Sequence, residues 1–362
     1  MLRGETPRTN WYGRQIRGGG AQLAGGWRAT LCQLRGDWAF YTEVFGFPQW
    51  NAAERMCWLC RASSTIRPLA WTRMGPDAGW RETRWTHESY IEFLRAASLA
   101  IPVLLTSVVG SRLECVMVDV LHTVDQGVAS HIIANIFWLL AVLRGVFGGR
   151  AQEERIANLF AHMKSWYKGW KPSSRLQGKL SVERVRTQGG WPKLKAKAAA
   201  TRHLAEYALL LMQEFGTPED RPVLAMSQLL CRFYQILSDE SMFLGHDARR
   251  ELPTVGRRLA MLYASVAEKA ARDGIKMWKM HPKLHIFLHL CEWQGVEVGN
   301  PRFFWTYADE DLVGLLVEVA QSCHPHNTGG KCPLQVVASL LRLSRGGRAR
   351  VRSGAPRAID CQ

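Results

Sequence analysis

Polar side chains that can exchange protons or bind metals interrupt the most apolar part of the chain. Residues 116–140, VMVDVLHTVDQGVASHIIANIFWLL, include Asp119, His122, Asp125 and His131. Asp119 and His122 can hydrogen-bond to each other, either to fix a loop inside a core or as part of a site. The residues alone leave both interpretations open. His131 is expected to be a buried histidine whose hydrogen bonds are satisfied.

A second group of candidate ligands is a pair of cysteines. Cys57 and Cys60 form a C-x-x-C motif, which is half of the ligand set of a zinc site. The chain has no second C-x-x-C motif, so further ligands would have to come from distant residues. The candidates are His87, His122 and, in the sequence CHPHNTGGKC, Cys323, His324, His326 and Cys332. The alternative is that Cys57 and Cys60 are two buried free thiols.

His285 and His289 are spaced four residues apart, which places both on one face of a helix. A zinc protease of the HExxH type would need a glutamate at position 286, where this chain has Ile286. The pair is therefore predicted to be core histidines or histidines that support another site. The chain also lacks a Walker A loop, a dinucleotide-binding fingerprint and a GxSxG motif.

Acidic residues stand at the beginning of two predicted helices. Asp37 follows a glycine and can cap a helix that begins at Trp38. Asp309, Glu310 and Asp311 lie in the first turn of a later helix, where the helix dipole favours negative charge.

A basic stretch, residues 164–202, contains eleven Lys and Arg residues and one Glu, interleaved with tryptophan and tyrosine. Cations for phosphates together with planar rings for bases are typical of a nucleic-acid-binding surface. The alternative is a lysine-rich helix face that is simply solvated. The candidate nucleic-acid-binding residues are Lys164, Trp166, Lys168, Trp170, Lys171, Arg175, Lys179, Lys193, Lys195 and Lys197.

The bulk composition agrees with a polyanionic partner. The 362 residues carry a formal net charge of +16, which favours nucleic acid. Nine cysteines are too few for a disulfide scaffold, and no signal peptide is apparent, so a nuclear or cytoplasmic protein with reduced thiols is expected. Residues 128–143 are the most apolar but short for a membrane span, and no membrane partner is predicted.

Mostly helical elements must position these residues. Apolar residues three and four apart predict a helix in most of the chain after residue 125. Two short buried strands are predicted, one ending near Asp37 and one over residues 115–122. Thr86 is a predicted N-cap. The predicted helices begin at Trp38 and Thr86 or cover residues 126–147, 152–170, 193–215, 221–238, 254–274, 282–293 and 309–323.

The order of these motifs resembles that of transposases from CACTA-like and related cut-and-paste DNA transposons. The motifs are RGDWAF, CWLC, VDVLH, PKLHIFLHL and YADEDL, and they cover roughly residues 20–325. The resemblance implies a ribonuclease-H-like fold with three catalytic acids that bind Mg²⁺ or Mn²⁺. Asp37 then resembles the second acid and Glu310 the third, with Asp309 and Asp311 as alternatives. Asp119 and His122 resemble the family's D-x-x-H motif.

No counterpart of the first acid is found, because the 36 residues before Asp37 contain no aspartate. Two-metal catalysis needs clustered carboxylates, so we expect a truncated, DNA-binding and inactive transposase remnant. The alternatives are a repurposed nucleic-acid-binding protein without catalysis and a helical structural or interaction protein. An incomplete sheet would expose an edge, which favours self-association or a missing N-terminal partner segment.

The resemblance predicts a helix-rich α/β fold, an incomplete ribonuclease-H-like core with a large α-helical insertion. The expected divisions are an irregular start (1–28), a partial core (29–150), a helical insertion (151–275), a return to the core (276–342) and a disordered basic tail (343–362).

Overall fold

The computed structural model describes residues 4–10, 12–22, 31–108 and 110–322. The predicted basic tail, 343–362, lies outside the described residues. So do the possible zinc ligands Cys323, His324, His326 and Cys332.

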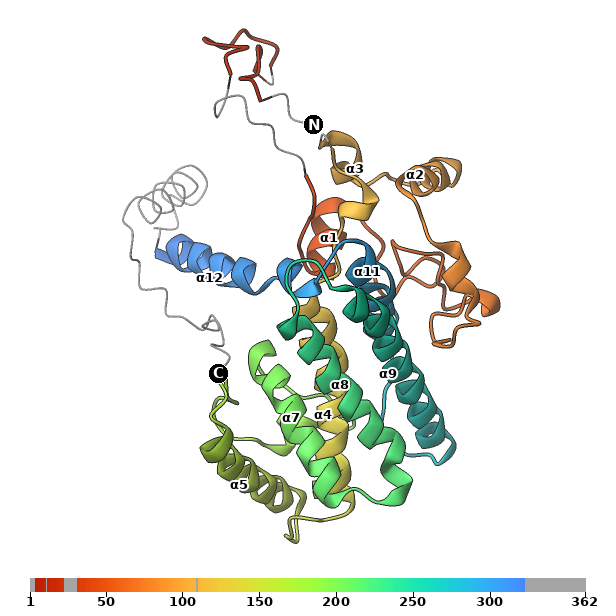
Figure 1. The fold of residues 1–362 in the computed structure, drawn as a ribbon, viewed down its shortest axis with the longest axis vertical. Coiled ribbons are helices and arrows are strands. Elements are labelled where there is room, and N and C mark those ends of the chain that lie inside the picture. Colours follow the sequence, from red (N-terminus) through yellow and green to blue (C-terminus); the bar gives the residue numbers. More distant parts are fainter. Residues whose placement is uncertain (1–3, 11, 23–30, 109, 323–362) are drawn as a thin grey trace. The chain divides into compact units, whose positions relative to one another are not determined.

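Helices dominate the described chain (Figure 1). The α-helices are α1 (Trp38–Phe45), α2 (His87–Ala96), α3 (Val103–Ser107), α4 (Ser130–Phe137), α5 (Gln152–Trp170), α6 (Val182–Val185), α7 (Ala198–Phe215), α8 (Arg221–Asp239), α9 (His246–Arg272), α10 (Pro282–His289), α11 (Gly295–Glu297) and α12 (Tyr307–Ser322). Short 3₁₀ helices cover Arg67–Leu69, Gly79–Thr83, Leu113–Cys115, Pro218–Asp220 and Pro301–Phe304. Wider π-helical turns cover Leu121–Ala129, Trp138–Leu143 and Leu290–Gln294.

The predicted α/β fold is wrong, because the described residues form helices and isolated bridges but no β-strand. The two segments expected to be strands come close to pairing. Leu34 donates to Cys115 O at 2.7 Å and accepts from the Met117 N–H at 2.9 Å, which makes one parallel bridge. Without a ladder of such bridges there is no sheet, and the ribonuclease-H-like core is absent from the described residues.

A glutamine side chain takes the place of a neighbouring strand. Gln294 accepts the Val118 N–H with its amide oxygen and donates its amide NH₂ to Val116 O, both at 2.8 Å. The extended segment thus satisfies its buried backbone groups through an amide, which offers the donor and acceptor of a peptide group. The helix then begins about six residues earlier than predicted, since Leu121 already lies in a π-helical turn.

Most of the other predicted helices are found. Trp38 and Thr86 mark helix starts as expected, and Thr86 caps α2 by accepting the Ser89 N–H. α7 begins later than predicted because the backbone N–H groups of Lys193 and Lys195 donate to Val185 and Arg184. These bonds hold residues 193–197 extended.

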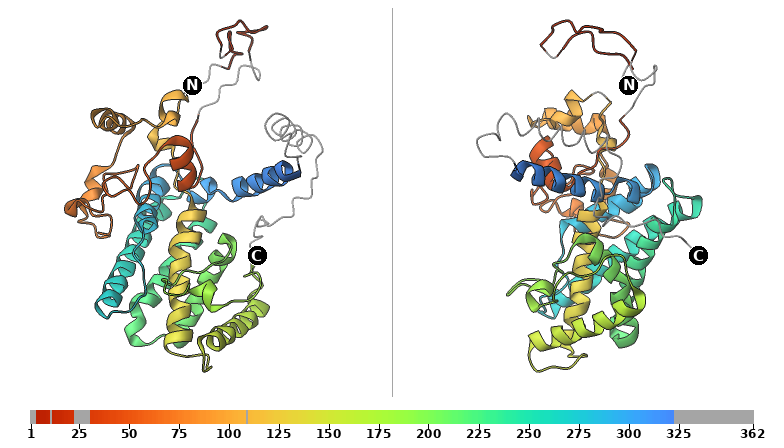
Figure 2. Two further views of the ribbon diagram at one scale, coloured as in Figure 1. Left: turned by 180° about the vertical axis from the view of Figure 1, so that it is seen from behind. Right: turned by 90° about the vertical axis from the view of Figure 1, so that its left-hand side faces the viewer.

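The chain forms two compact units. Unit 1 consists of 1–119, 236–265 and 280–304, and unit 2 of 120–235, 266–279 and 305–362. In unit 2, α7 packs along the helical run Leu121–Leu143, as two opposite views show (Figures 1 and 2). This run is long and apolar enough to cross a membrane, but 83% of its most apolar window is buried inside the protein. Such burial is typical of a core helix.

In unit 1, α9 approaches the π-helical turn after α10 closely at a glycine. A Cβ atom added at Gly256 would lie 2.6 Å from the Cβ of Cys291, so only glycine permits this approach.

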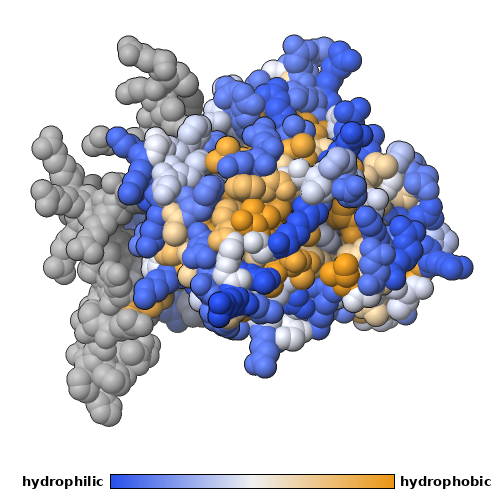
Figure 3. Space-filling model, turned by 90° about the horizontal axis from the view of Figure 1, so that it is seen from below, coloured by the Kyte–Doolittle hydropathy of each residue, from blue (hydrophilic) through white to orange (hydrophobic). Residues whose placement is uncertain are grey.

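On one face of the surface, hydrophobic residues lie between strongly hydrophilic ones (Figure 3).

Candidate functional site

Unit 1 encloses four side chains that have the chemistry of metal ligands. The Sγ atoms of Cys57 and Cys60 and ring nitrogens of His285 and His289 all lie within 4.8 Å of one another. All four residues are buried, and neither cysteine forms a disulfide. In the described part of the chain, no other group of three or more His, Cys, Asp or Glu residues is as close. This cluster could hold a metal ion.

The distances fit a tetrahedral site. Cys60 Sγ lies 3.4 Å from Nε2 of His285 and 3.4 Å from Nε2 of His289. Zinc bonds of about 2.3 Å to sulfur and about 2.0–2.1 Å to nitrogen place tetrahedral S and N ligands roughly 3.5 Å apart. The two Nε2 atoms are 2.9 Å apart, against roughly 3.3 Å in the same tetrahedron. For these three ligands a shift of a few tenths of an ångström would give tetrahedral spacing, and Cys57 Sγ lies within 4.8 Å of each of them.

A turn presents the two sulfurs from outside any helix. The Leu59 N–H donates to Cys57 Sγ at 3.3 Å, and the Ala62 N–H donates to Cys60 Sγ at 3.4 Å. Backbone donors of this kind favour the thiolate over the thiol. The backbone N–H of Trp85 donates to Leu59 O at 3.0 Å and holds this turn in place.

Helix α10 presents the two imidazoles. His285 and His289 are one turn apart on its inner face, so both Nε2 atoms reach the sulfurs. Trp80 packs edge-on against both rings, and Trp293 lies 4.1 Å from the His289 ring. The Nδ1 atoms of the two histidines have no hydrogen-bond partner. Aromatic rings, rather than the usual carboxylates or carbonyls, therefore orient these histidines.

Protonation equilibria at the cluster favour neutral imidazole and one thiolate. Burial lowers the pKa of His289 to about 4. For Cys57, burial opposes ionisation, but hydrogen bonds from Cys60 and the histidines bring the pKa well below its ordinary value. Burial and the neighbouring Cys57 raise the pKa of Cys60. The second thiol must therefore lose its proton as a metal binds.

A buried ion-pair network lies beside the cluster. Glu292, in the π-helical turn after α10, pairs with Arg81 and, at 3.0 Å, with Arg257 of α9. Arg81 also donates to Met74 O and Gly75 O. The cysteine-bearing segment is thus tied to α9 and α10 independently of any ion.

Sequence reasoning found half of this cluster. Cys57 and Cys60 are part of it, as predicted for a zinc site. His285 and His289 were assigned to the core or to support of another site, and they are instead its other two members. Of the proposed completing ligands, His87 accepts the Leu113 N–H. The missed signal is the i, i+4 spacing of His285 and His289. Two histidines on one helix face supply two metal ligands, as a second C-x-x-C motif would.

The predicted catalytic acids are found in helix-terminal positions. Asp37 caps α1 by accepting the Phe40 N–H at 2.6 Å, which matches the capping interpretation. Glu310 lies in the first turn of α12 and pairs with His122, whose Nε2 is 3.0 Å from its carboxylate. Asp119 is buried at the end of the extended segment. The alternatives Asp309 and Asp311 lie beside Glu310 in the same turn.

Two further polar residues of the apolar run are satisfied in the core of unit 2. Asp125 is fully buried and accepts hydrogen bonds from the hydroxyls of Tyr234 and Tyr307, both at 2.5 Å. His131 hydrogen-bonds to Pro192 O at 3.0 Å, as expected for a buried, satisfied histidine.

The basic stretch forms an exposed surface of unit 2. Lys164 and Lys168 lie one turn apart near the end of α5, Lys171 is its C-cap residue, and all three are exposed. About half a turn around the helix from Lys164 and Lys168, the rings of Trp166 and Trp170 stack at 6.3 Å and 13°, and Trp170 is 56% exposed.

The extended residues after α6 continue the basic surface. Lys193, Lys195 and Lys197 alternate with the buried or half-buried Pro192, Leu194 and Ala196, so every second side chain faces solvent. Lys195 pairs with Glu183 at 2.8 Å. Among the described residues, the other seven cationic candidates form no ion pair; they are Lys164, Lys168, Lys171, Arg175, Lys179, Lys193 and Lys197.

Comparison with known proteins adds no assignment. No family model, no curated protein and no solved structure matches the chain. The resemblance to transposases therefore stays a prediction from the sequence motifs.

Proposed function

We propose that this chain is a non-catalytic nucleic-acid-binding protein in which a zinc ion holds unit 1 together. The observation that supports nucleic-acid binding is the basic surface of unit 2. Lys164 and Lys168 lie one turn apart near the end of α5 and Lys171 is its C-cap residue, while the stacked pair Trp166–Trp170 lies about half a turn around the same helix end. Lysines without acidic partners attract phosphates, and exposed rings stack on bases.

Zinc is the metal that the ligand set supports best. Two thiolates and two imidazoles in a tetrahedron form the ligand set of a structural zinc site. Mg²⁺ and Mn²⁺ prefer oxygen ligands, and no carboxylate belongs to the cluster. Four protein ligands fill a tetrahedral site and leave no position for substrate, so the ion would serve the fold. Nuclear or cytoplasmic reduced thiols would suit such a centre.

The absence of catalysis is proposed because the cluster lacks the acids of a two-metal site. Glu310 pairs with His122 and Asp37 caps α1, so each of these acids already has a local structural role. The transposase interpretation and its non-catalytic alternative both include nucleic-acid binding. The basic surface of unit 2 supports this shared property.

The test of nucleic-acid binding is the salt dependence of the affinity. Fluorescence anisotropy with a labelled single-stranded oligonucleotide should give saturable binding at about 50 mM salt that weakens steeply as salt rises. The variant Lys164→Gln/Lys168→Gln/Lys171→Gln should lower the affinity at least tenfold. It should also reduce the slope of log K against log salt by about 2, because each lost phosphate contact removes about 0.7.

A matched control removes three exposed positive charges from α9, in the variant Arg249→Gln/Arg250→Gln/Arg258→Gln. It should leave the slope nearly unchanged. Equal weakening by both triple variants would mean that net charge alone drives binding. No binding at low salt would overturn the proposal.

The test of the metal is its content and spectrum. Protein purified with added zinc should contain about one zinc per chain, and Co²⁺ substitution should give the absorption of a tetrahedral thiolate site. Protein that remains free of both metals after such loading would rule the zinc centre out.

A further inference from the structure

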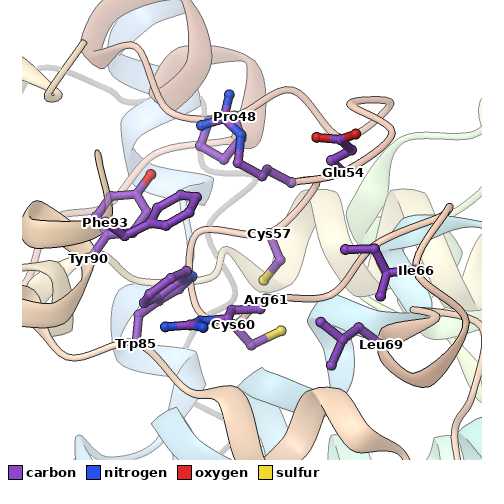
Figure 4. Close-up of a pocket in the computed structure, with 11 residues that line it drawn as sticks. Pro48, Glu54, Cys57, Cys60, Arg61, Ile66, Leu69, Trp85, Tyr90 and Phe93 are labelled. Carbon is purple, nitrogen blue, oxygen red and sulfur yellow. The ribbon is translucent and has the colours of Figure 1, made fainter. Parts of the chain in front are cut away.

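A cavity of about 290 Å³ opens in unit 1 directly beside the metal cluster. Cys57 and Cys60 form part of its wall, so the cavity and the cluster share two residues. Figure 4 shows the aromatic side chains of Trp85, Tyr90 and Phe93 on one side and Ile66 and Leu69 on the other. Apolar walls with a few polar groups are typical of small-molecule sites, and this volume is at their lower limit.

The aromatic wall is rigid. The Trp85 ring lies 4.9 Å from that of Phe93 and 5.7 Å from that of Tyr90. Tyr90 stacks in turn on the buried Phe47 at 6.3 Å and 9°. Rings fixed by their neighbours offer a planar ligand a stacking surface without losing side-chain entropy.

Two arginines also line the cavity, and neither has a carboxylate partner among the described residues. The Arg61 guanidinium lies 4.4 Å from the centroid of the Trp85 ring. Stacking of this kind fixes the plane of the guanidinium and leaves its N–H groups free for a bidentate bond to an oxyanion. Arg55 provides a second positive charge. The lining carries two positive charges against the single negative charge of Glu54, so an anionic ligand is favoured.

One acceptor completes the lining. Glu54 lies on the rim and has no ion pair or hydrogen bond in the described structure. A carboxylate in that place accepts hydrogen bonds from an exocyclic amino group, as Glu does from N4 of cytosine. A ligand that combines a planar ring, an amino group and a phosphate would satisfy the wall, Glu54 and the arginines together.

We propose that this cavity binds one nucleotide through its base and phosphate, with a preference for bases that carry an exocyclic amino group. The base stacks on the aromatic wall, its amino group donates to Glu54, and its phosphate accepts from Arg61 and Arg55. This proposal rests on the proposed function and deepens it: unit 1 would read a base, and the basic surface of unit 2 would contact phosphates.

The experiment is a calorimetric titration of the full-length, zinc-loaded protein with cytidine monophosphate. Saturable binding is expected, with weaker binding of uridine monophosphate and at least tenfold weaker binding of cytidine and of inorganic phosphate alone. Arg61→Gln should weaken the nucleotide at least tenfold. Arg61→Lys should recover only part of the affinity, because lysine lacks the planar fork. Glu54→Gln should reduce the preference for cytidine over uridine monophosphate.

Arg67→Gln is the matched control, since Arg67 is exposed in the same segment but does not line the cavity. Equal weakening by Arg67→Gln, binding of inorganic phosphate as tight as that of the nucleotide, or no saturation at millimolar nucleotide would overturn the pocket. The triple lysine variant of α5 should still bind the mononucleotide. If it does while the wild type fails to bind oligonucleotides, the pocket stands and the proposed function fails. If oligonucleotides bind and the mononucleotide does not, the reverse holds.

Discussion

At the scale of residues, four side chains far apart in the sequence meet in the interior of unit 1. Cys57 and Cys60 come from a turn, and His285 and His289 come from α10, more than 220 residues later. Without an ion, the cluster buries the Cys57 thiolate and holds the two Nε2 atoms 2.9 Å apart. A buried charge without a partner of opposite sign is costly, so the metal-free cluster is a weak point that zinc would stabilise.

Removal of one sulfur should abolish metal binding. Cys60→Ser is expected to lose nearly all bound zinc, because Cys60 Sγ faces both imidazoles at 3.4 Å. The unfolding midpoint should fall by roughly 5–10 °C, since a structural zinc contributes its binding free energy to folding. Elemental analysis and calorimetry measure both effects. Cys231→Ser, in unit 2 and outside the cluster, should keep full zinc content; an unchanged zinc content in Cys60→Ser would contradict the assignment.

Acid should destabilise the metal-free protein through His289. Its pKa is lowered to about 4 by burial, while an unfolded histidine titrates near 6.5. Between these values the unfolded chain binds a proton that the folded chain excludes, so the free energy of unfolding falls as pH falls through this window. The expected loss between pH 7 and pH 5 is roughly 1–2 kcal/mol.

Urea unfolding of chelator-treated protein at pH 7 and at pH 5 measures this loss. His289→Gln should show a smaller pH dependence, because its side chain does not titrate. An equal pH dependence in both proteins would assign the effect to other groups.

At the scale of elements, one side-chain amide replaces a sheet. The segment around Val116–Val118 has the β-branched, apolar composition of a buried strand, yet in the described structure it forms only one bridge with Leu34. Gln294 bonds the Val118 N–H and the Val116 O, and the Tyr41 hydroxyl donates to Met117 O. A strand-like sequence therefore needs no sheet when a buried amide supplies the same hydrogen bonds.

Loss of this amide should destabilise unit 1. Gln294→Leu keeps a similar volume but leaves the Val118 N–H and the Val116 O buried without partners. The expected cost is about 2–4 kcal/mol, from two unsatisfied backbone groups. Chemical denaturation gives the difference directly. Gln213→Leu, on the exposed face of α7, serves as the control and should change stability by less than about 0.5 kcal/mol. A similar small change in Gln294→Leu would show that water replaces the amide.

At the scale of the whole molecule, two compact units divide the chemistry. The metal cluster and the cavity belong to unit 1, and the basic surface belongs to unit 2. The segment between α1 and α2 contains only two short 3₁₀ helices. Such a segment gains little from local hydrogen bonds, so its order depends on the buried Trp80, the ion pairs of Arg81 and the proposed zinc.

Metal removal should therefore open this segment first. Limited trypsin digestion after chelation is expected to cut at exposed arginines of this segment, namely Arg61, Arg67 and Arg73, before sites in α5 or α9. Added zinc should restore protection, and added Mg²⁺ should not. Mass spectrometry of the early fragments identifies the sites. Early cuts in α5 or α9, with the segment intact, would show that the metal does not order it.

The sequence by itself determined the local features of this protein. Helical periodicity located α5 and α8, Asp37 and Thr86 were predicted as capping residues, and the C-x-x-C pair was predicted as possible metal ligands, because each of these signals lies within a few residues. Only the tertiary structure decided the rest. Whether residues 115–122 become a strand depends on the partner that reaches them, and that partner is Gln294, about 175 residues away. The same holds for the candidate metal cluster. His285 and His289 can be paired with the two cysteines only after folding brings α10 to the cysteine turn, because the sequence does not show which distant buried groups come into contact.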